Sequence, residues 1–107
     1  MAARTLKPRA LRRARGRAQL KLVRDLERLA RLAPGGAADR PIAVVSPAQV
    51  EVMAEARPCP LCQARLRLEE HAAATVDGAR VRVARLACIA CGTKRQIYFR
   101  LTDRPLH

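Results

Sequence analysis

Leucines and alanines recur at spacings of three and four from about Leu11 to Leu32. An α-helix turns once every 3.6 residues, so this spacing places them on one face. Arginines fill most other positions, and Pro34 with two glycines after it ends the pattern. The sequence therefore predicts a basic helical arm over residues 1–33. Its apolar stripe consists of Leu11, Ala14, Ala18, Leu22, Leu26, Leu29 and Ala33.

A change of composition divides the chain after this arm. Residues 34–41, PGGAADRP, contain little beyond glycine, proline and small or charged residues, which predicts a flexible linker. From residue 42 onward the apolar positions follow period two, which is typical of strands. We therefore expect a second domain over residues 42–107.

The beginning of this second domain fits two kinds of element. Apolar residues alternate with charged or longer ones from Val50 to Ala56, and we prefer a strand here. A helix competes for the stretch, because Ser46, Pro47 and Gln49 have the order of an N-cap, a first helical proline and a capping-box residue.

Three strands with a hairpin account for most of the remaining pattern. Asp77 and Gly78 form a dipeptide that favours a two-residue turn between two strands. The alternation slips before Leu86, so we expect a β-bulge or a kink in the strand after this turn. A last strand covers residues 96–101. The positions expected to face inward are Leu66, Leu68, Val81, Val83, Ile97, Phe99 and Leu101.

All four cysteines of the chain belong to two CxxC motifs, and residues 63–87 separate the two. Each motif presents two sulfurs from a tight turn, and a hairpin between the motifs can bring the turns together. Four thiolates suit one tetrahedral Zn²⁺ per chain, and iron is the alternative. Gly92 supplies a left-handed backbone position after the second motif, and Gln63 stands in the matching place after the first, which makes the two halves unequal. The expected ligands are Cys59, Cys62, Cys88 and Cys91.

The order of strand, CxxC, hairpin, CxxC and strand resembles the zinc ribbon superfamily, from about Val50 to Leu101. The resemblance implies a small metal-stabilised β fold, a three-stranded antiparallel zinc ribbon with the metal at one end, here following a basic N-terminal α-helix. It also implies ligand roles for the four cysteines. Members of the superfamily serve in transcription, in translation and as extensions of enzymes, so the resemblance implies no activity.

We do not expect catalysis from these residues. Four thiolates leave no open position on a metal for a reactive water, and neither CxxC has the βαβ setting of a redox dithiol. His71 is expected on the strand face opposite Leu66 and Leu68, as a solvated surface histidine. Glu69 and Glu70 are neighbours in the same strand and are expected to point to opposite faces, so they do not form an acid and base pair.

The charge of the chain favours an anionic partner. A net charge of +13 indicates nucleic acid first, RNA or DNA, although GC-rich coding bias, which produces arginine and alanine, competes as an explanation. We expect contacts through the arm and through an outward sheet face where one exposed tyrosine stands among arginines. The expected binding residues are Arg12, Arg13, Arg15, Arg17, Arg65, Arg67, Arg80, Arg82, Tyr98 and Arg100.

The competing function is protein–protein interaction. In this interpretation Leu22, Leu26 and Leu29 dock on a larger complex, and zinc is purely structural. No apolar run approaches the roughly 20 residues of a membrane helix, so we expect no membrane span. The cysteines favour metal over disulfides in a reducing compartment, so we expect a cytoplasmic protein.

Overall fold

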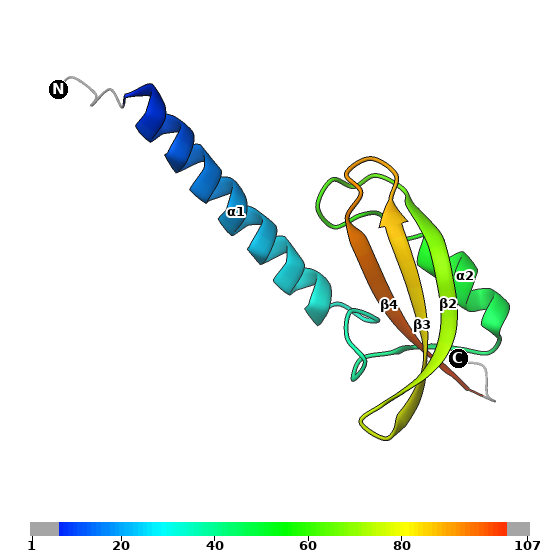
Figure 1. The fold of residues 1–107 in the computed structure, drawn as a ribbon. Helices are drawn as coiled ribbons and strands as arrows, with labels where there is room; N and C mark the ends of the chain where they lie inside the picture. The colour runs from blue at the N-terminus through cyan, green and yellow to red at the C-terminus, as the bar shows by residue number, and fades with distance from the viewer. Residues whose placement is uncertain (1–6, 103–107) are drawn as a thin grey trace.

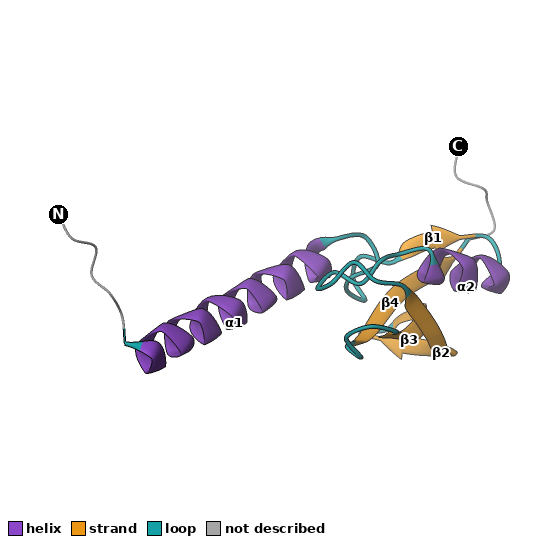
Figure 2. Ribbon diagram, turned by 90° about the horizontal axis from the view of Figure 1, so that it is seen from above, coloured by secondary structure: helices purple, strands orange, loops and turns teal. Residues whose placement is uncertain are grey.

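The computed structural model describes residues 7–102, which form two helices and one four-stranded sheet (Figure 1). Helix α1 extends away from the sheet, whereas α2 lies against the sheet (Figure 2). The molecule is elongated for this reason, with extents of 66 × 26 × 25 Å. The elements are α1 (Pro8–Leu32), β1 (Ile42–Val44), α2 (Pro47–Glu55), β2 (Leu66–Val76), β3 (Ala79–Cys88) and β4 (Lys94–Leu101).

Helix α1 confirms the helix predicted from about Leu11 to Leu32, whereas residues 1–6 of the predicted arm lie outside the described part of the chain. The helix starts at Pro8, earlier than the pattern indicated, because proline suits a first helical position where the amide has no intrahelical acceptor. None of its residues is buried. Leu22 and Leu29 of the apolar stripe are 57% and 63% exposed. Among residues 7–102, no helix is both long and apolar enough to cross a membrane.

Helix α2 shows that the preferred strand prediction from Val50 to Ala56 is wrong. The Ser46 side chain accepts a hydrogen bond from the Gln49 amide, as an N-cap does. Val50 and Ala54 are buried against the sheet, four residues apart. A spacing of four satisfies both period two and the helical period, so the alternation alone was ambiguous, and the capping residues gave the better signal.

The sheet is mixed, so the expectation of three antiparallel strands is wrong in part. Its order is β1-β4-β3-β2, and the β2–β3 and β3–β4 pairs are antiparallel as expected. The additional strand β1 pairs in parallel with β4, with Ile42 opposite Phe99 and Val44 opposite Leu101. A strand of three residues is too short to produce a periodic pattern of its own.

The segment 34–41, predicted as a flexible linker, runs along the edge of β4 in a series of turns. Gly35 accepts a hydrogen bond from the Tyr98 amide (2.8 Å) and is itself buried. Its φ is +81°, and a Cβ at this position would lie 2.8 Å from Ile42 Cδ1 and 2.9 Å from Ile97 Cγ2. The close approach of the segment to the sheet therefore requires glycine here. The division into arm, linker and ribbon domain stays a prediction.

The hairpin turn between β2 and β3 is confirmed. Asp77 and Gly78 have φ values of 49° and 81°, so both adopt the left-handed conformation of a tight two-residue turn. Aspartate tolerates this conformation better than most residues, and glycine adopts it freely. The dipeptide therefore positions the two strands in register.

The β-bulge lies in β2, whereas it was expected in β3. The register steps from Leu68 opposite Leu86 to Glu70 opposite Arg85, which leaves Glu69 without a partner position. The extra residue places both carboxylates on one side of the sheet, where Glu69 binds Lys94 (2.8 Å) and Glu70 binds Arg85 (2.8 Å). The expectation that they point to opposite faces is therefore wrong.

The bulge also changes which residues face the core. Beyond it, His71 lies opposite Ala84 on the core face and is half-buried, so the expectation of a solvated surface histidine is wrong. Strand β3 has no interruption, so Val81 and Val83 lie on the face opposite Leu86. Both valines are buried, but they lie outside the main core cluster.

The main core lies between α2 and one face of the sheet. Two of its members are cysteines, so the core continues directly into the cysteine turns. Leu101 was expected to face inward but is exposed, because β4 ends beyond the core. The buried residues of this cluster are Val44, Val50, Ala54, Cys59, Leu66, Ala84, Leu86, Cys88, Ile97 and Phe99.

Candidate metal centre

The two CxxC motifs form turns of the same kind, which we call the first and second knuckle (residues 59–64 and 88–93). In each knuckle, the amide of the first cysteine donates to a carbonyl five residues later, and an amide four residues later donates back to that cysteine. The bonds are Cys59 N to Ala64 O (2.8 Å), Gln63 N to Cys59 O (2.8 Å), Cys88 N to Thr93 O (3.0 Å) and Gly92 N to Cys88 O (3.0 Å).

The residue after the second cysteine of each knuckle is left-handed, which was predicted for Gly92 and holds for Gln63 as well. Gln63 has φ 64° and Gly92 has φ 73°. A left-handed conformation costs a residue with a Cβ roughly 1–2 kcal/mol, whereas glycine adopts it freely. The Ile89 amide also donates to the Arg65 carbonyl (3.1 Å), which joins the second knuckle to the chain after the first. The backbone therefore fixes both knuckles in facing positions.

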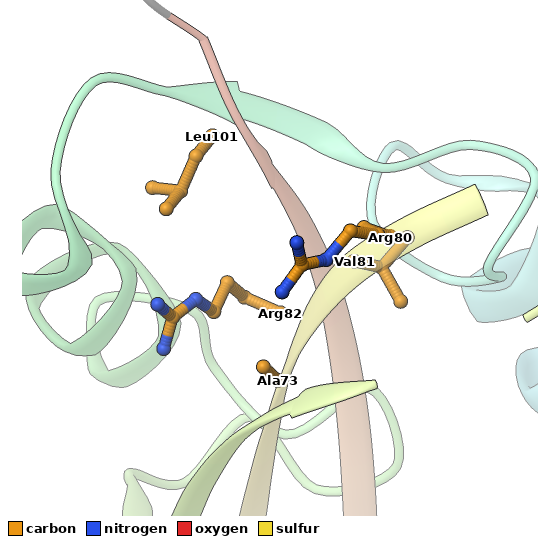
Figure 3. A pocket seen from close by; sticks show the side chains of 5 residues that line it. All are labelled: Ala73, Arg80, Val81, Arg82 and Leu101. Atoms are coloured by element: carbon orange, nitrogen blue, oxygen red, sulfur yellow. The ribbon is translucent and has the colours of Figure 1, made fainter. Parts of the chain in front are cut away.

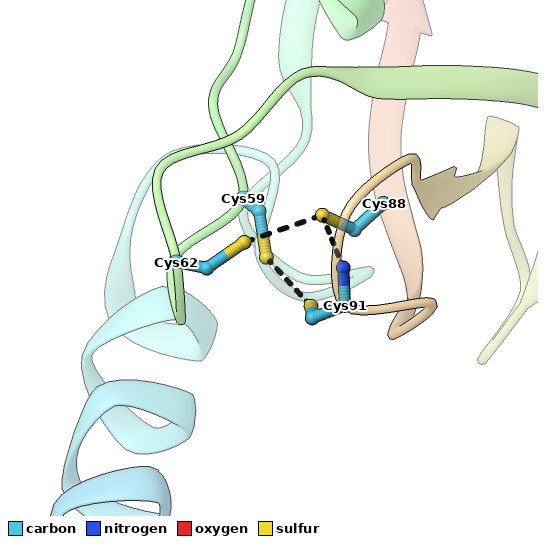
Figure 4. A group of neighbouring side chains, drawn as sticks. All are labelled: Cys59, Cys62, Cys88 and Cys91. Atoms are coloured by element: carbon cyan, nitrogen blue, oxygen red, sulfur yellow. Dashed lines mark hydrogen bonds between the residues drawn. The ribbon is translucent and has the colours of Figure 1, made fainter.

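The four cysteine sulfurs converge on one point between the knuckles (Figure 4). All four Sγ atoms lie within 4.8 Å of one another. The distance is 3.7 Å from Cys59 Sγ to Cys91 Sγ and 3.3 Å from Cys62 Sγ to Cys88 Sγ. A tetrahedral ion with metal–sulfur bonds near 2.3 Å holds its sulfurs about 3.8 Å apart. The predicted quartet is therefore assembled with the dimensions of one tetrahedral ion.

The surroundings of the sulfurs favour thiolates in the second knuckle. Hydrogen bonds from Thr93 lower the pKa of Cys91 to about 6. The Cys91 amide donates to the sulfur of Cys88 and lowers the pKa of that thiol. The Ala64 amide acts to lower the pKa of Cys62, but the neighbouring thiols and burial outweigh it and raise that pKa to about 12.

The contrast arises because the four thiols lie close enough to affect one another's ionisation. Four negative charges at these distances repel one another, so the cluster retains protons until a positive ion neutralises it. Four thiolates are soft ligands that suit Zn²⁺ or iron, and together they complete a tetrahedral shell. The donor set therefore fits a closed structural site with no position for a reactive water.

An arginine beside this cluster attaches α1 to the sheet. Arg95 donates through both terminal nitrogens to both carboxylate oxygens of Glu27 in α1. The Arg95 side chain is only 12% exposed, and that of Glu27 is 29% exposed. The hydrogen bonds from Arg95 lower the pKa of Glu27. The pKa of Arg95 is raised by Glu27 and also by the negative charge of Cys59 and Cys91.

The pair was missed in the sequence because its two residues are far apart in the chain and no local pattern joins them. A carboxylate within an arginine-rich helix is a weak signal at best, since such residues usually face solvent. The pair fixes the base of α1 at the metal end of the sheet.

The four α1 arginines of the expected binding set lie at the surface, and their role in binding stays a prediction. Arg12, Arg13, Arg15 and Arg17 are all exposed. Within residues 7–102 the ion pairs are Arg85–Glu70, Lys94–Glu69 and Arg95–Glu27, so none of these four arginines has a carboxylate partner there.

The arginines of the sheet do not share one face, so that expectation is wrong. Tyr98 pairs with Val83 and lies on the face away from α2, where Arg67 and Arg100 also lie by alternation. Arg82 instead pairs with Phe99 and shares its face. Arg80 lies on that same face, because two residues along a strand restore the same side. Arg65 precedes β2 and forms an isolated bridge with Pro58.

Comparison with known proteins gives no relative: no protein-family model, no curated protein and no solved structure matches the chain. The resemblance to the zinc ribbon superfamily therefore rests on the four clustered cysteines.

Proposed function

We propose that the chain is a zinc-binding accessory protein that associates with nucleic acid, RNA or DNA, through α1 and arginines of the sheet. One Zn²⁺ held by the four cysteines has a structural role. Zinc is preferred to iron because a given set of ligands binds Zn²⁺ more tightly than Fe²⁺. A closed shell of four thiolates also supports a role other than catalysis. Four cysteines arranged to bind metal rather than to form disulfides support a reducing, cytoplasmic location.

The observation that carries this proposal is the unpartnered charge of α1. The first acidic residue of the whole chain is Asp25, so more than half of the helix carries positive charge only. Arginines four positions apart, such as Arg9 with Arg13 and Arg13 with Arg17, repel each other by a few tenths of a kcal/mol per pair. A row of phosphates relieves this repulsion and releases bound counterions.

A protein partner is the second candidate, and the exposed leucines of α1 favour it. Leu22 and Leu29 are more than half exposed, whereas Leu26 between them is half-buried. In this alternative, a larger complex covers the leucines, and the charge only steers the encounter. The two candidates differ in their dependence on salt, because phosphate binding weakens steeply with salt and apolar docking does not.

The test is the affinity of the full chain for single-stranded RNA and DNA oligonucleotides, measured by fluorescence anisotropy over a salt series. The variant R12Q/R13Q/R15Q/R17Q should weaken binding and reduce the log–log salt slope by roughly 0.7 for each lost phosphate contact. The matched control L22Q/L29Q keeps the charge and should leave the slope unchanged. Equal slopes for the parent and the arginine variant would contradict the proposal.

A further inference from the structure

Two arginines of β3 project into one cavity near the hairpin end of the sheet (Figure 3). A space of about 340 Å³ is lined by Arg80, Val81 and Arg82 of β3, together with Ala73 of β2 and Leu101 of β4. The register explains the arrangement, since Arg82 lies opposite Ala73 and Arg80 lies opposite Thr75 on the same face. The cavity is therefore built by three adjacent strands.

The charge in this cavity has no counterpart among residues 7–102. The ion pairs of that part of the chain use other arginines, so neither Arg80 nor Arg82 is bound to a carboxylate there. Figure 3 shows both guanidinium groups turned toward the space beside Leu101. Two like charges that share one cavity repel each other, and an anion placed between them attracts both and outweighs that repulsion.

The chemistry of the lining selects the kind of anion. A guanidinium presents a planar fork of N–H donors that matches the oxygens of a phosphate, and two forks can bind one phosphate from two sides. Ala73 and Leu101 add an apolar wall that suits the sugar attached to a backbone phosphate. Arg82 is half-buried and Arg80 is exposed, so the site is open to a long chain of phosphates.

We propose that this cavity is a phosphate-binding site, and that the phosphate belongs to the backbone of a polynucleotide. The assignment of the source rests on the proposed function, whereas the site itself depends only on the cavity and its two arginines. A free phosphate ion offers the same chemistry, so the experiment must separate the two sources. Arg80 and Arg82 then act apart from Arg67, Tyr98 and Arg100, which lie on the other face.

The first arm of the test uses inorganic phosphate. The arginine Nε–H signals of the full chain, labelled with ¹⁵N, are followed by NMR during a phosphate titration at constant ionic strength with chloride. The signals of Arg80 and Arg82 should shift and saturate together, while that of Arg85 should stay in place. Shifts that are equal for all arginines, or that never saturate, would overturn the site.

The second arm uses a single-stranded oligonucleotide. R80Q/R82Q should weaken its binding about tenfold and reduce the log–log salt slope by only about 0.7, because both arginines neutralise one phosphate. The matched control R40Q/R57Q removes the same charge at two positions outside α1 and outside the proposed binding residues, and it should keep the response to inorganic phosphate. Equal losses of oligonucleotide affinity in the two variants would overturn the assignment to a polynucleotide.

The two experiments distinguish a failure of the proposed phosphate site from a failure of the proposed function. Saturating phosphate shifts without oligonucleotide binding would support the site and contradict the proposed function. Oligonucleotide binding without phosphate shifts would overturn the site and leave the function standing. Asp103 is the first carboxylate after Leu101 in the sequence. Phosphate shifts that occur only in D103N would overturn the site, because the chain would then neutralise its own arginines.

Discussion

Removal of the Glu27 carboxylate is the sharpest test of how α1 is attached to the sheet. The substitution Glu27→Gln leaves Arg95 with a positive charge, 12% side-chain exposure and no anionic partner on α1. Breaking a buried ion pair by removing one partner costs about 3–5 kcal/mol, whereas an exposed pair contributes about 0.2–1 kcal/mol. The Glu27 side chain is 29% exposed, so this pair lies between the two limits.

We expect Glu27→Gln to lower the free energy of unfolding by about 1–2 kcal/mol, which is less than the loss of a fully buried ion pair would cost. Helix α1 has no buried residue, so it can move away and let water reach Arg95. Free energies of unfolding from urea titrations give the magnitude, and amide hydrogen exchange reports whether α1 is released. The matched control is Glu70→Gln, because the pair of Glu70 with Arg85 is more than half exposed and should lose at most about 1 kcal/mol.

The dependence on pH follows from the direction of the Glu27 pKa. Arg95 lowers the pKa of the folded carboxyl below its ordinary value of 4.5, so the unfolded chain binds the proton more readily. The pair of Glu27 with Arg95 therefore stabilises the folded state fully above about pH 5.5, and this stabilisation is lost as the pH falls through the pKa of Glu27 in the folded chain. The difference in stability between the parent and E27Q should narrow over that acid range. A cost for E27Q equal to that of E70Q would refute the proposed attachment.

Four further substitutions test local features of the backbone. Gly36→Ala places a Cβ 2.0 Å from the Ala30 carbonyl oxygen, and this clash should cost about 1–3 kcal/mol in thermal unfolding. At Gly16 a Cβ meets no atom within 4 Å, so Gly16→Ala should stabilise α1 by about 0.5–1 kcal/mol. Ser46→Ala removes the N-cap of α2 and should cost about 1 kcal/mol in urea titrations, with Ser46→Asp as a control that retains it. A Cβ at Gly92 would meet no atom within 4 Å, but the φ of +73° strains any residue that has one. Gly92→Ala should therefore weaken metal binding by about 1 kcal/mol, measured by competition with a chelator. An unchanged affinity would contradict the need for a left-handed residue there.

Local chemistry made part of the fold predictable. The cysteine quartet could be predicted because two CxxC turns and a hairpin leave few other ways to place four thiols. Asp77 and Gly78 fixed the hairpin through their backbone preferences. The three-residue strand β1 was out of reach, since its pairing with β4 depends on residues more than fifty positions away.

The errors in the sheet have one physical origin. Residues 68–72 read Leu-Glu-Glu-His-Ala, so no large apolar residue marks where the extra position of the bulge falls. The slip in apolar phase was visible only in the partner strand, and the bulge was therefore placed there. The same misplacement put Arg80 and Arg82 on the face of Tyr98 and His71 on the solvent side. A one-residue shift in strand register moves every side chain beyond it to the other face of the sheet.

The central claim is that four cysteines bind one structural Zn²⁺, and metal content joined to folding tests it most directly. Elemental mass spectrometry on the purified full chain should give one zinc per chain, and removal of zinc by a chelator should abolish cooperative unfolding of the sheet. The variant Cys88→Ser should lose the metal and the cooperative transition together. A chain that contains no zinc or iron, or that unfolds with unchanged stability after the metal is removed, would contradict this account.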